Sequence, residues 1–407
     1  MTTAKVFHIP ALLALIATAG ALDAQKVTVL ATGLKNPTKM IRTPAGSLLV
    51  TETDTTPNSG RLTLVTTGGL ARPLITGLPS GLAAPNGDAD GPSGIVLAGR
   101  VLFLEIGEGD GFSNGPKPGQ LVPNPKGISS PIFASILKFT LSADVEQVMG
   151  TFTLTAQTQS DLGFGKAVSL SDGAGATAVC EIVTQFRPGI PDPNTIWRNS
   201  HPYAMTFLPA SPSSVVLTPN PPGLTPTPGA DLVPQTAGTL YAADAGMNLV
   251  WQVDAVTGKT KALTQFASTP DPVPGPPFIE PVPDSIQVYN GQLLVTLLSG
   301  APFVGGQSRV ILVDPVTGAQ SLFIALLSSA IDVGYMPQLL GRPVFYVLQF
   351  SNSLATGGPG QLLRYDSTVP KVYVDNLKAP SSMVMDPATG AVYIAERGGG
   401  DILVVTP

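Results

Sequence analysis

Short segments in which apolar and polar residues alternate recur along most of the 407-residue chain. Glycine, proline or asparagine stands between them, and alternation over so few residues is typical of half-buried β-strands. In residues 238–244, GTLYAAD, one such segment ends on an acid, turns through glycine and is followed by a second strand pattern, LVWQVD. The 44 glycines and 41 prolines favour many short elements joined by turns over long helices.

The GTLYAAD segment is one of six similar segments that recur about every fifty residues, with one longer gap before Asp244. The six copies are GSLLVTE ending at Glu52, GRVLFLE at Glu105, GTLYAAD at Asp244, GQLLVTL at Leu297, RPVFYVL at Leu348 and GAVYIAE at Glu396. A strand pattern that usually begins with proline precedes each copy, and one or two further strand patterns follow it. Four strands per repeat of this length make a propeller blade. The sequence therefore predicts an all-β protein, a six-bladed β-propeller with four-stranded blades.

The last repeat lacks a fourth strand, but KVTVLATGL at residues 26–34 precedes the first repeat with no other role. We expect this N-terminal strand to pair with the last blade and close the ring, which removes exposed sheet edges. A seventh blade in the longer gap is the less favoured alternative, because no proline-started pair of strands occurs there. The expected single domain is 25–407, with blades near 36–78, 87–154, 199–267, 283–327, 329–377 and 378–407 plus 26–34, and insertions at 107–133, 155–198 and 209–237.

The first 24 residues have the pattern of a secretory signal peptide. Lys5 is followed by an apolar run, and small residues lead to Ala24, where we expect cleavage. A membrane anchor is the less favoured alternative, because the apolar run is short and contains Pro10. This pattern predicts a secreted, periplasmic or cell-surface protein with no membrane span after cleavage.

Charge and residue counts exclude several function classes. The net charge is −5 and the charged residues make up 12% of the chain, so no basic surface for nucleic acid is expected. The one cysteine, Cys180, lies in a strand pattern and predicts a buried, inert thiol. His8 would leave with the signal peptide, and His201 alone does not make a multi-histidine metal site. The expected partner is a protein, a glycan or a small molecule.

Residues that enter the first strand of a blade and leave its second strand share one face of a propeller. On this basis, the candidate binding face comprises Glu52, His201, Asp244, Asp284, Asp332, Glu396 and Arg397. The acids that end repeated strands (Glu52, Glu105, Asp244 and Glu396) are expected to accept backbone N–H groups, a role that every blade needs. Asp332 aligns with an inward-facing residue of the other inner strands and is expected to line the channel, where a buried carboxylate needs a partner.

The segment NGDADG, residues 86–91, resembles the start of a calcium loop, with oxygen ligands at alternate positions before a glycine. The candidate ligands are Asp88, Asp90, Glu105 and Asp110, and Ca²⁺ is the one cofactor considered. The distal glutamate of such a loop is missing, because Leu97 stands there. A solvated turn rich in Asn, Asp and Gly explains the same residues and is the favoured interpretation.

Several stretches resemble the ScyD/ScyE family of exported proteins with NHL-like propeller repeats. The matching stretches are VTVLATGLKNPTKM, SHPYAM with GTLYAADAGMNLVWQVD, VPDSIQVYNGQLLVTLLSGAPF and APSSMVMDPATGAVYIAERGGGDILVV. The resemblance implies a secreted six-bladed propeller, and the family offers no catalytic residues to transfer. Leu297 departs from the acid that commonly ends the second strand of blade four, so a complete acidic ring is not expected.

Two function classes follow from these observations. A binding or scaffold propeller of the ScyD/ScyE type, with its binding face at the channel mouth, is preferred. The alternative is a divalent-metal-dependent lactonase or hydrolase similar to gluconolactonase-type propellers. A quinone-dependent sugar dehydrogenase ranks third, on a faint likeness in RNSHPYAMTF. No GxSxG motif or phosphate loop is present.

Overall fold

The computed structural model describes residues 25–84, 86–116, 121–186, 199–210, 237–271, 278–337 and 342–407. The predicted signal peptide lies outside this range. The described part is built almost entirely of β-strands, with one α-helix, α1 (Ala156–Gly163), and one short 3-10 helix, η1 (Leu354–Thr356). No helix in the described ranges has both the length and the apolar character needed to cross a membrane.

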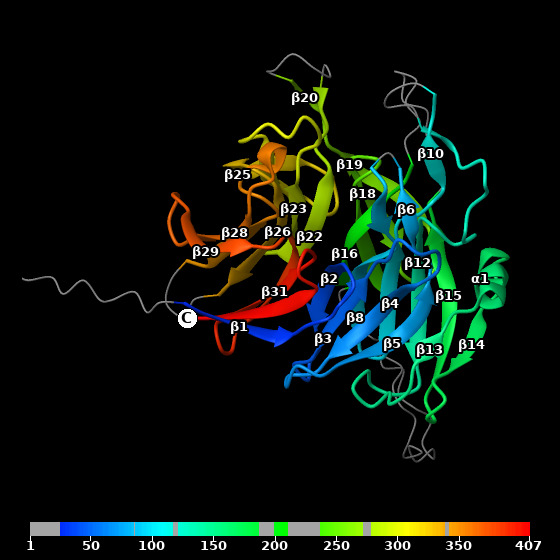
Figure 1. Cartoon of the computed structure of the whole chain (residues 1–407). Helices are drawn as coiled ribbons and strands as arrows, with labels where there is room; N and C mark the ends of the chain where they lie inside the picture. The colour runs from blue at the N-terminus through cyan, green and yellow to red at the C-terminus, as the bar shows by residue number, and fades with distance from the viewer. Residues whose placement is uncertain are drawn as a thin grey trace, which may run out of the picture.

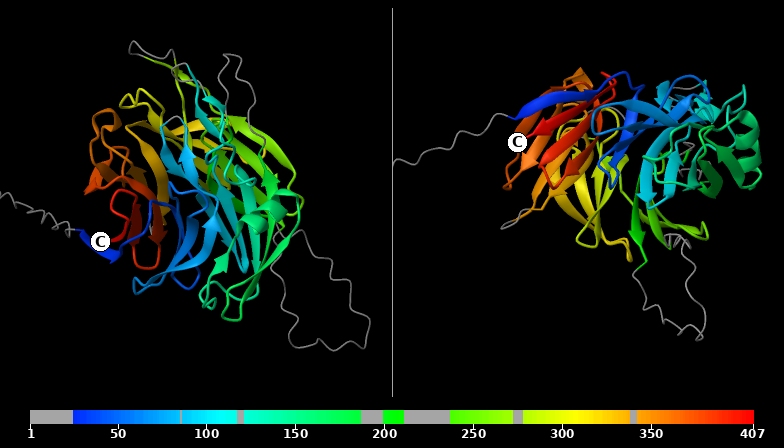
Figure 2. Two further views of the ribbon diagram at one scale, coloured as in Figure 1. Left: turned by 45° about the vertical axis from the view of Figure 1, so that its right-hand side comes forward. Right: turned by 90° about the horizontal axis from the view of Figure 1, so that it is seen from below.

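Six sheets of four principal strands are arranged around a common axis, which confirms the predicted six-bladed β-propeller (Figure 2). Blade one consists of β2 (Pro37–Arg42), β3 (Leu48–Glu52), β4 (Gly60–Val65) and β5 (Ala71–Leu78). Blade two consists of β8 (Pro92–Ala98), β9 (Val101–Ile106), β12 (Ser135–Leu141) and β15 (Thr177–Gln185). Blade three consists of β16 (Pro202–Pro209), β17 (Gly238–Asp244), β18 (Leu249–Asp254) and β19 (Thr260–Gln265).

The remaining three blades complete the ring. Blade four consists of β22 (Pro283–Tyr289), β23 (Gln292–Leu297), β24 (Ser308–Val313) and β25 (Gln320–Leu327). Blade five consists of β26 (Ala330–Met336), β27 (Val344–Gln349), β28 (Gly360–Tyr365) and β29 (Lys371–Leu377). Blade six consists of β30 (Pro380–Asp386), β31 (Ala391–Glu396), β32 (Asp401–Thr406) and β1 (Lys26–Ala31). The antiparallel pair β1–β32 closes the ring as expected, with Lys26 opposite Thr406.

The innermost strands β2, β8, β16, β22, β26 and β30 stand side by side around the channel. The first residue of each inner strand pairs with the second strand of the same blade. A bulge follows in each inner strand before regular pairing resumes. Five of the six first residues are prolines, which lack an N–H and are tolerated at the first position of a strand. Ala330 takes that place in blade five. The bulge decides which side chain of each strand faces the channel.

The fourth strand of blade two differs from the one expected. Blade two was expected to end at residue 154, with its last strand pattern at residues 146–154. The fourth strand is instead β15, within the expected insertion 155–198, and β14 (Val168–Ser171) extends the sheet further. Within 146–154, β13 (Phe152–Thr153) instead pairs in parallel with β5 of blade one. Val148, Phe152 and Leu162 of α1 are fully buried in the hydrophobic core shared by blades one and two. This segment therefore covers the outer edge of blade one, because its apolar side chains are buried there.

Three short hairpins are added to the blades. They are β6 (Gly81–Ala83) with β7 (Asp88–Asp90), β10 (Phe112–Asn114) with β11 (Leu121–Pro123), and β20 (Thr269–Pro270) with β21 (Phe278–Ile279). Figure 1 shows β6, β10 and β20 towards the top, the side on which the inner strands begin. Most of the predicted insertion 209–237 lies outside the described residues. Cys180 lies in β15, fully buried, and burial raises the pKa of its thiol, as expected of an inert cysteine.

Candidate functional site in the central channel

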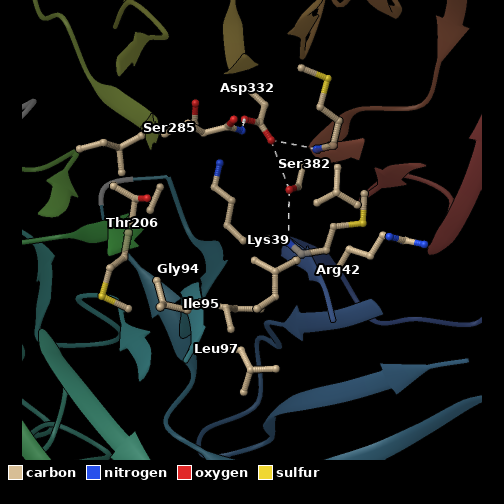
Figure 3. A pocket seen from close by; sticks show the side chains of 18 of the residues that line it. Lys39, Arg42, Gly94, Ile95, Leu97, Thr206, Ser285, Asp332 and Ser382 are labelled. Carbon is tan, nitrogen blue, oxygen red and sulfur yellow. Dashed lines mark hydrogen bonds between the residues drawn. The ribbon is translucent and has the colours of Figure 1, made fainter. Parts of the chain in front are cut away.

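One side-chain position of each inner strand, just after the bulge, forms a ring at mid-channel (Figure 3). The six residues of this ring are Lys39, Gly94, Ala204, Ser285, Asp332 and Ser382. The sequence alignment of the repeats had placed Asp332 at this position, and the structure puts it there. Only Lys39 and Asp332 carry charged side chains, so the ring holds one cation and one carboxyl group.

Lys39 is buried in the channel and paired with a carboxylate of blade four. Its Nζ lies 3.0 Å from Asp284 Oδ2 and donates a longer hydrogen bond of 3.4 Å to the carbonyl oxygen of Ile331. The ammonium also lies 4.8 Å from the centre of the Tyr203 ring, within the range of a cation–π contact. Burial alone would lower the pKa of Lys39, but Asp284, Tyr203 and Asp332 together hold that pKa above its usual value. Lys39 is therefore a fixed positive charge.

Asp332 is held by donors from three strands. Its Oδ1 accepts from the Val333 N–H at 2.9 Å and from Gln287 Nε2 at 3.3 Å. Its Oδ2 accepts from the Met383 N–H at 2.9 Å and from Ser382 Oγ at 3.4 Å. Burial raises the pKa of Asp332, while Lys39 and the two backbone donors oppose that shift. The carboxyl group thus ties blade five to blades four and six.

At the mouth where the inner strands begin, His201 lies between two carboxyl groups. Its Nε2 is 3.1 Å from Asp90 Oδ1, and its Nδ1 is 3.9 Å from Glu108 Oε1. Asp90 Oδ2 also accepts a hydrogen bond of 2.6 Å from the Gly109 N–H. Although burial opposes protonation, Asp90 and Glu108 raise the pKa of His201 to about 10. Burial raises the pKa of Glu108 to about 7 despite the nearby His201.

These groups form a continuous layer across the mouth. The His201 ring meets the edge of Tyr203 at 5.4 Å between centroids, and Tyr203 in turn lies over Lys39. We call this layer the ionic plug, and it consists of Lys39, Asp284, Tyr203, His201, Asp90 and Glu108. Arg397, a predicted binding-face residue, donates from Nη2 to the carbonyl oxygen of Ala89 at 2.7 Å and so fixes the β6–β7 hairpin beside the plug.

Below the ionic plug, the channel widens into a cavity of about 750 Å³. All six inner strands line it, from the mid-channel ring to the ends of the strands at the opposite face. Its walls are mostly aliphatic, with Met383, Met385 and Phe207 among them, and Arg42 and Tyr335 stand near its outer end. A second cavity of about 400 Å³ shares Arg42, Tyr335 and Met385 with it. The lining of the larger cavity also includes polar residues, among them Thr206 and Gln287. A concave space in which apolar residues and placed polar groups meet is a usual form of a small-molecule site.

The four predicted calcium ligands do not come together. Residues 88–90 pair with β6 as a strand, which leaves Asp88 exposed while Asp90 is buried against His201. Asp110 Oδ1 accepts from the Ser129 N–H at 2.9 Å and so closes its own loop. Glu105 lies apart, in the body of blade two. In the described ranges no three His, Cys, Asp or Glu side chains are placed to hold a metal ion, so these residues do not fit the calcium loop.

Three of the acids that end repeated strands accept hydrogen bonds from the loops and strands next to them. Asp244 accepts from the N–H groups of His201 and Met247, at 2.8 and 2.9 Å, and from Trp251 Nε1 at 2.8 Å. Glu52 accepts from both Nε and Nη2 of Arg61, at 2.8 and 2.6 Å. Glu396 accepts from the Lys378 N–H at 2.7 Å. Each is fully or almost fully buried, and these contacts join strands within and between blades.

Glu105 is not a fourth copy of these acids. Proline at the start of an inner strand pairs with Glu52, Asp244 and Glu396 in blades one, three and six, but with Ile106 in blade two. The expectation that Glu105 repeats the pattern is therefore wrong by one residue. That shift turns its side chain to the other face of the sheet. It then leans over Gly94, where a side chain at position 94 would clash with Glu105 Oε2.

The environment of Glu105 is unusual for an acid. Neither carboxyl oxygen has a hydrogen-bond partner of normal geometry among the described residues, and the side chain is fully buried. Burial raises the pKa of Glu105 well above its usual value, the Asp244 carboxylate adds to the shift, and Lys39 opposes it. Burial of an acid without such partners favours its uncharged form.

Three residues of the ionic plug, Lys39, Tyr203 and Glu108, were not among the predicted site residues. Lys39 is nevertheless the one cation in the aligned inner-strand position. That contrast was a usable signal, because a cation facing a propeller axis needs a partner across the ring. Tyr203 gave no such signal, because a tyrosine two residues after His201 fits an ordinary strand.

No family model matches the chain, and no curated protein matches it. Among solved structures, the PQQ-bound aldose sugar dehydrogenase of Streptomyces coelicolor matches with a TM-score of 0.46 and 15% identity, over 94% of this chain and 98% of that one. The apo form of the soluble aldose sugar dehydrogenase of Escherichia coli matches with 0.47 and 12%, over 94% and 99%. Virginiamycin B lyase of Staphylococcus aureus matches with 0.40 and 13%, over 94% and 99%. Likenesses at this level carry no argument about the chemistry of the channel.

Proposed function

We propose that this protein is a binding propeller of the ScyD/ScyE type, exported from the cell, that holds a small molecule in its central channel. The observation that carries the proposal is the cavity of about 750 Å³ that all six inner strands line. Its lining combines apolar residues with polar groups at the mid-channel ring and on the walls, which suits orientation of a ligand. The repeat segments quoted above, which resemble ScyD/ScyE proteins, support the family part of the proposal.

The charges around the cavity favour binding over hydrolysis. Lys39 is engaged by Asp284, and His201 by Asp90. Asp332 accepts from four donors, so its carboxylate is held in place and is poorly suited to activate water. The alternative, a divalent-metal-dependent lactonase, has less support because the candidate acids Asp88, Asp90, Glu105 and Asp110 do not converge.

The test is a thermal-shift screen of the mature protein against sugars, lactones, phenols and other small metabolites. Binding compounds are expected to raise the melting temperature in proportion to ligand excess. Thr206→Trp places a large side chain in the cavity and should abolish the shift, because Thr206 lines it (Figure 3). Gln265→Trp, at an exposed position on the outer strand of the same blade, is the matched control and should retain the shift.

Two results would contradict the proposal. Shifts that persist in Thr206→Trp would place binding outside the channel. Hydrolysis of a lactone that requires added Ca²⁺ and is lost in Asp90→Asn would favour the lactonase instead.

A further inference from the structure

The two ends of the channel are built differently, and this difference indicates how a ligand enters and what it is. We propose that the cavity takes an uncharged, ring-containing molecule with a hydrogen-bond acceptor, which enters from the face where the inner strands end. This inference rests on the proposed function and adds the route of entry and the class of ligand. The predicted binding face lay at the other mouth.

The mouth where the inner strands begin is closed by the ionic plug. The side chains of Lys39 and Asp284 are only 7% and 9% exposed, and Asp90 is 4% exposed. A ligand passing this way would have to separate the buried Lys39–Asp284 pair and the pair of Asp90 with His201, whose side chain is 22% exposed. Separated charges in such surroundings are strongly unfavourable. The cavity lining accordingly begins at Lys39 and includes neither Tyr203 nor His201.

The opposite end has no such closure among the residues that line it. The cavity continues to residues at or near the ends of the inner strands, Arg42, Leu97, Phe207 and Tyr335. There the second cavity adjoins it and extends to the exposed Pro387. Arg42 forms an ion pair with Asp386 at 3.2 Å. These residues end β2 and β30, which are neighbouring inner strands, so the pair lies along the wall and does not cross the opening. As far as the described residues go, this end is the accessible one.

The floor of the cavity offers donors to a ligand. Four donors already use the Asp332 carboxylate, so it has little capacity to accept from a further group. Lys39 has three N–H bonds, of which Asp284 and the Ile331 carbonyl take two. Ser285 Oγ accepts from Thr296 Oγ1 at 3.0 Å, which leaves the Ser285 proton to be donated. The matching ligand group is therefore an acceptor, such as a carbonyl, ether or hydroxyl oxygen.

The charged groups around the cavity are already engaged with one another or with donors, which favours an uncharged ligand. At the floor, one cation, Lys39, faces the two carboxyl groups of Asp284 and Asp332. At the outer end, Asp386 already pairs with Arg42. An anion would therefore find no uncompensated positive charge, and a cation would find the Asp332 oxygens already occupied. Burial of an unpaired charge is costly, so both are disfavoured.

The walls near the opening suit a ring. Tyr335 is held by other aromatic side chains, with its ring 4.9 Å from Tyr289 and 6.0 Å from Phe345. Met383 and Met385 line the same part of both cavities. Flexible thioethers beside a fixed tyrosine adapt well to flat apolar surfaces. The ring would lie between these side chains with its acceptor directed to Lys39.

The experiment uses 6-propionyl-2-(dimethylamino)naphthalene, an uncharged naphthalene ketone whose emission shifts on leaving water. The sulfonate dye 1-anilinonaphthalene-8-sulfonate is the anionic comparison. Because Cys180 is buried, an introduced surface cysteine can be modified selectively with a bulky polyethylene-glycol maleimide. Pro387→Cys places the label at the proposed opening, and Asp88→Cys, at an exposed residue, places it beside the ionic plug.

The ketone is expected to bind the unmodified protein more tightly than the sulfonate. Modification of Pro387→Cys should weaken ketone binding at least tenfold, and modification of Asp88→Cys should leave it unchanged. Tyr335→Ala should also weaken it. The reverse pattern of the two labels, tighter binding of the sulfonate, or no binding of the ketone would overturn the inference. The thermal-shift screen distinguishes failure of this inference from failure of the proposed function. If charged compounds raised the melting temperature and Thr206→Trp abolished that rise, the inference would be wrong and the proposed function would stand.

Discussion

The two ends of the channel are built from the same six inner strands but carry side chains of different character. At the mouth where the strands begin, six polar and charged side chains contact one another, and Lys39, Asp284 and Asp90 among them are buried. At the other end, the same strands carry methionine, leucine and aromatic residues around an open cavity. The polar residues are the ones that the sequence pattern favours as a binding face. Their mutual pairing indicates that they close the channel, while the less conspicuous apolar residues form the space for a ligand.

The comparison also separates stability from binding. Breaking a buried ion pair leaves a charge without a partner, so substitutions in the ionic plug should act mainly on the free energy of unfolding. Substitutions at the open end remove wall surface or a partly exposed pair, so they should act mainly on binding. Each prediction below tests one side of this division.

The largest effect is expected for Lys39→Met. Removal of the ammonium leaves Asp284 buried without its cation, which should lower the free energy of unfolding by roughly 3–5 kcal/mol in denaturant titrations. The double variant Lys39→Met/Asp284→Asn removes both charges and should recover most of that loss. If Lys39→Met were as stable as the natural protein, the plug would not be a closed, desolvated layer.

A second effect concerns the pH dependence of stability. The pKa of His201 is raised to about 10 in the folded protein, against an ordinary value of 6.5. The stability that its protonation supplies is therefore full below pH 6.5 and is lost as pH rises towards 10, by at most about 1.4 kcal/mol per pH unit. We expect His201→Gln to flatten the decline between pH 7.5 and 10, a range above the pKa of about 7 of Glu108. Denaturant titrations at several pH values would measure it, and an unchanged slope would contradict the pairing with Asp90.

The third effect should be a gain in stability. Because burial raises the pKa of Glu105, the unfolded chain ionises first as pH rises above 4.5, and the folded state is disfavoured. Glu105→Gln removes this titration, so its free energy of unfolding should match that of the natural protein at pH 4 and exceed it at pH 8, by at most about 1.4 kcal/mol per pH unit above 4.5.

The matched control for Glu105 is Glu52→Gln. Glu52 accepts from Arg61 in a buried pair, so its substitution should destabilise the protein at pH 8. Thermal unfolding of both variants at the two pH values distinguishes a repeated anchoring acid from the unrepeated neutral one. Loss of stability at pH 8 in Glu105→Gln would show that Glu105 is ionised and paired.

The smallest effect on stability is expected at the open end. Arg42→Met breaks the pair with Asp386, but the Arg42 side chain is 32% exposed, so the loss should stay below about 1 kcal/mol. The same substitution should change binding of the naphthalene ketone, because Arg42 lines both cavities. A loss as large as that of Lys39→Met would remove the distinction between the two ends.

The sequence predicts the propeller because each blade repeats the same four strands, and the strand at residues 26–34 leaves a single way to close the ring. The prediction failed for the outer strand of blade two, because residues 146–154 and β15 both have strand patterns. Only the burial of residues 146–154 between blades one and two decides which segment joins the sheet. The prediction also misplaced Glu105, because the repeats were aligned on the glycine before the second strand. Gly99 is the first residue of the turn between Ala98 and Val101, whereas Gly291 is the second residue of the turn between Tyr289 and Gln292.

The ionic plug was harder to predict than the fold. Lys39 and Asp284 are 245 residues apart, and they meet only because blades one and four face each other across the channel. Repeat spacing predicts which residues share a face of the ring, but not which of them pair. Asp284, His201 and Asp332 were nevertheless identified, because an unrepeated polar residue in a repeated position stands out against its copies.

The central claim, that the channel is closed at one end and open at the other, can be tested by the reactivity of a cysteine inside it. Thr206→Cys lines the cavity, and its rate of reaction with a small methanethiosulfonate reagent reports access. We expect the cysteine to react readily. The reaction rate should be at least tenfold lower when Leu97→Trp narrows the strand-end opening, and unchanged when Asp88→Trp adds bulk beside the ionic plug. Slower reaction with Asp88→Trp and an unchanged rate with Leu97→Trp would contradict the claim.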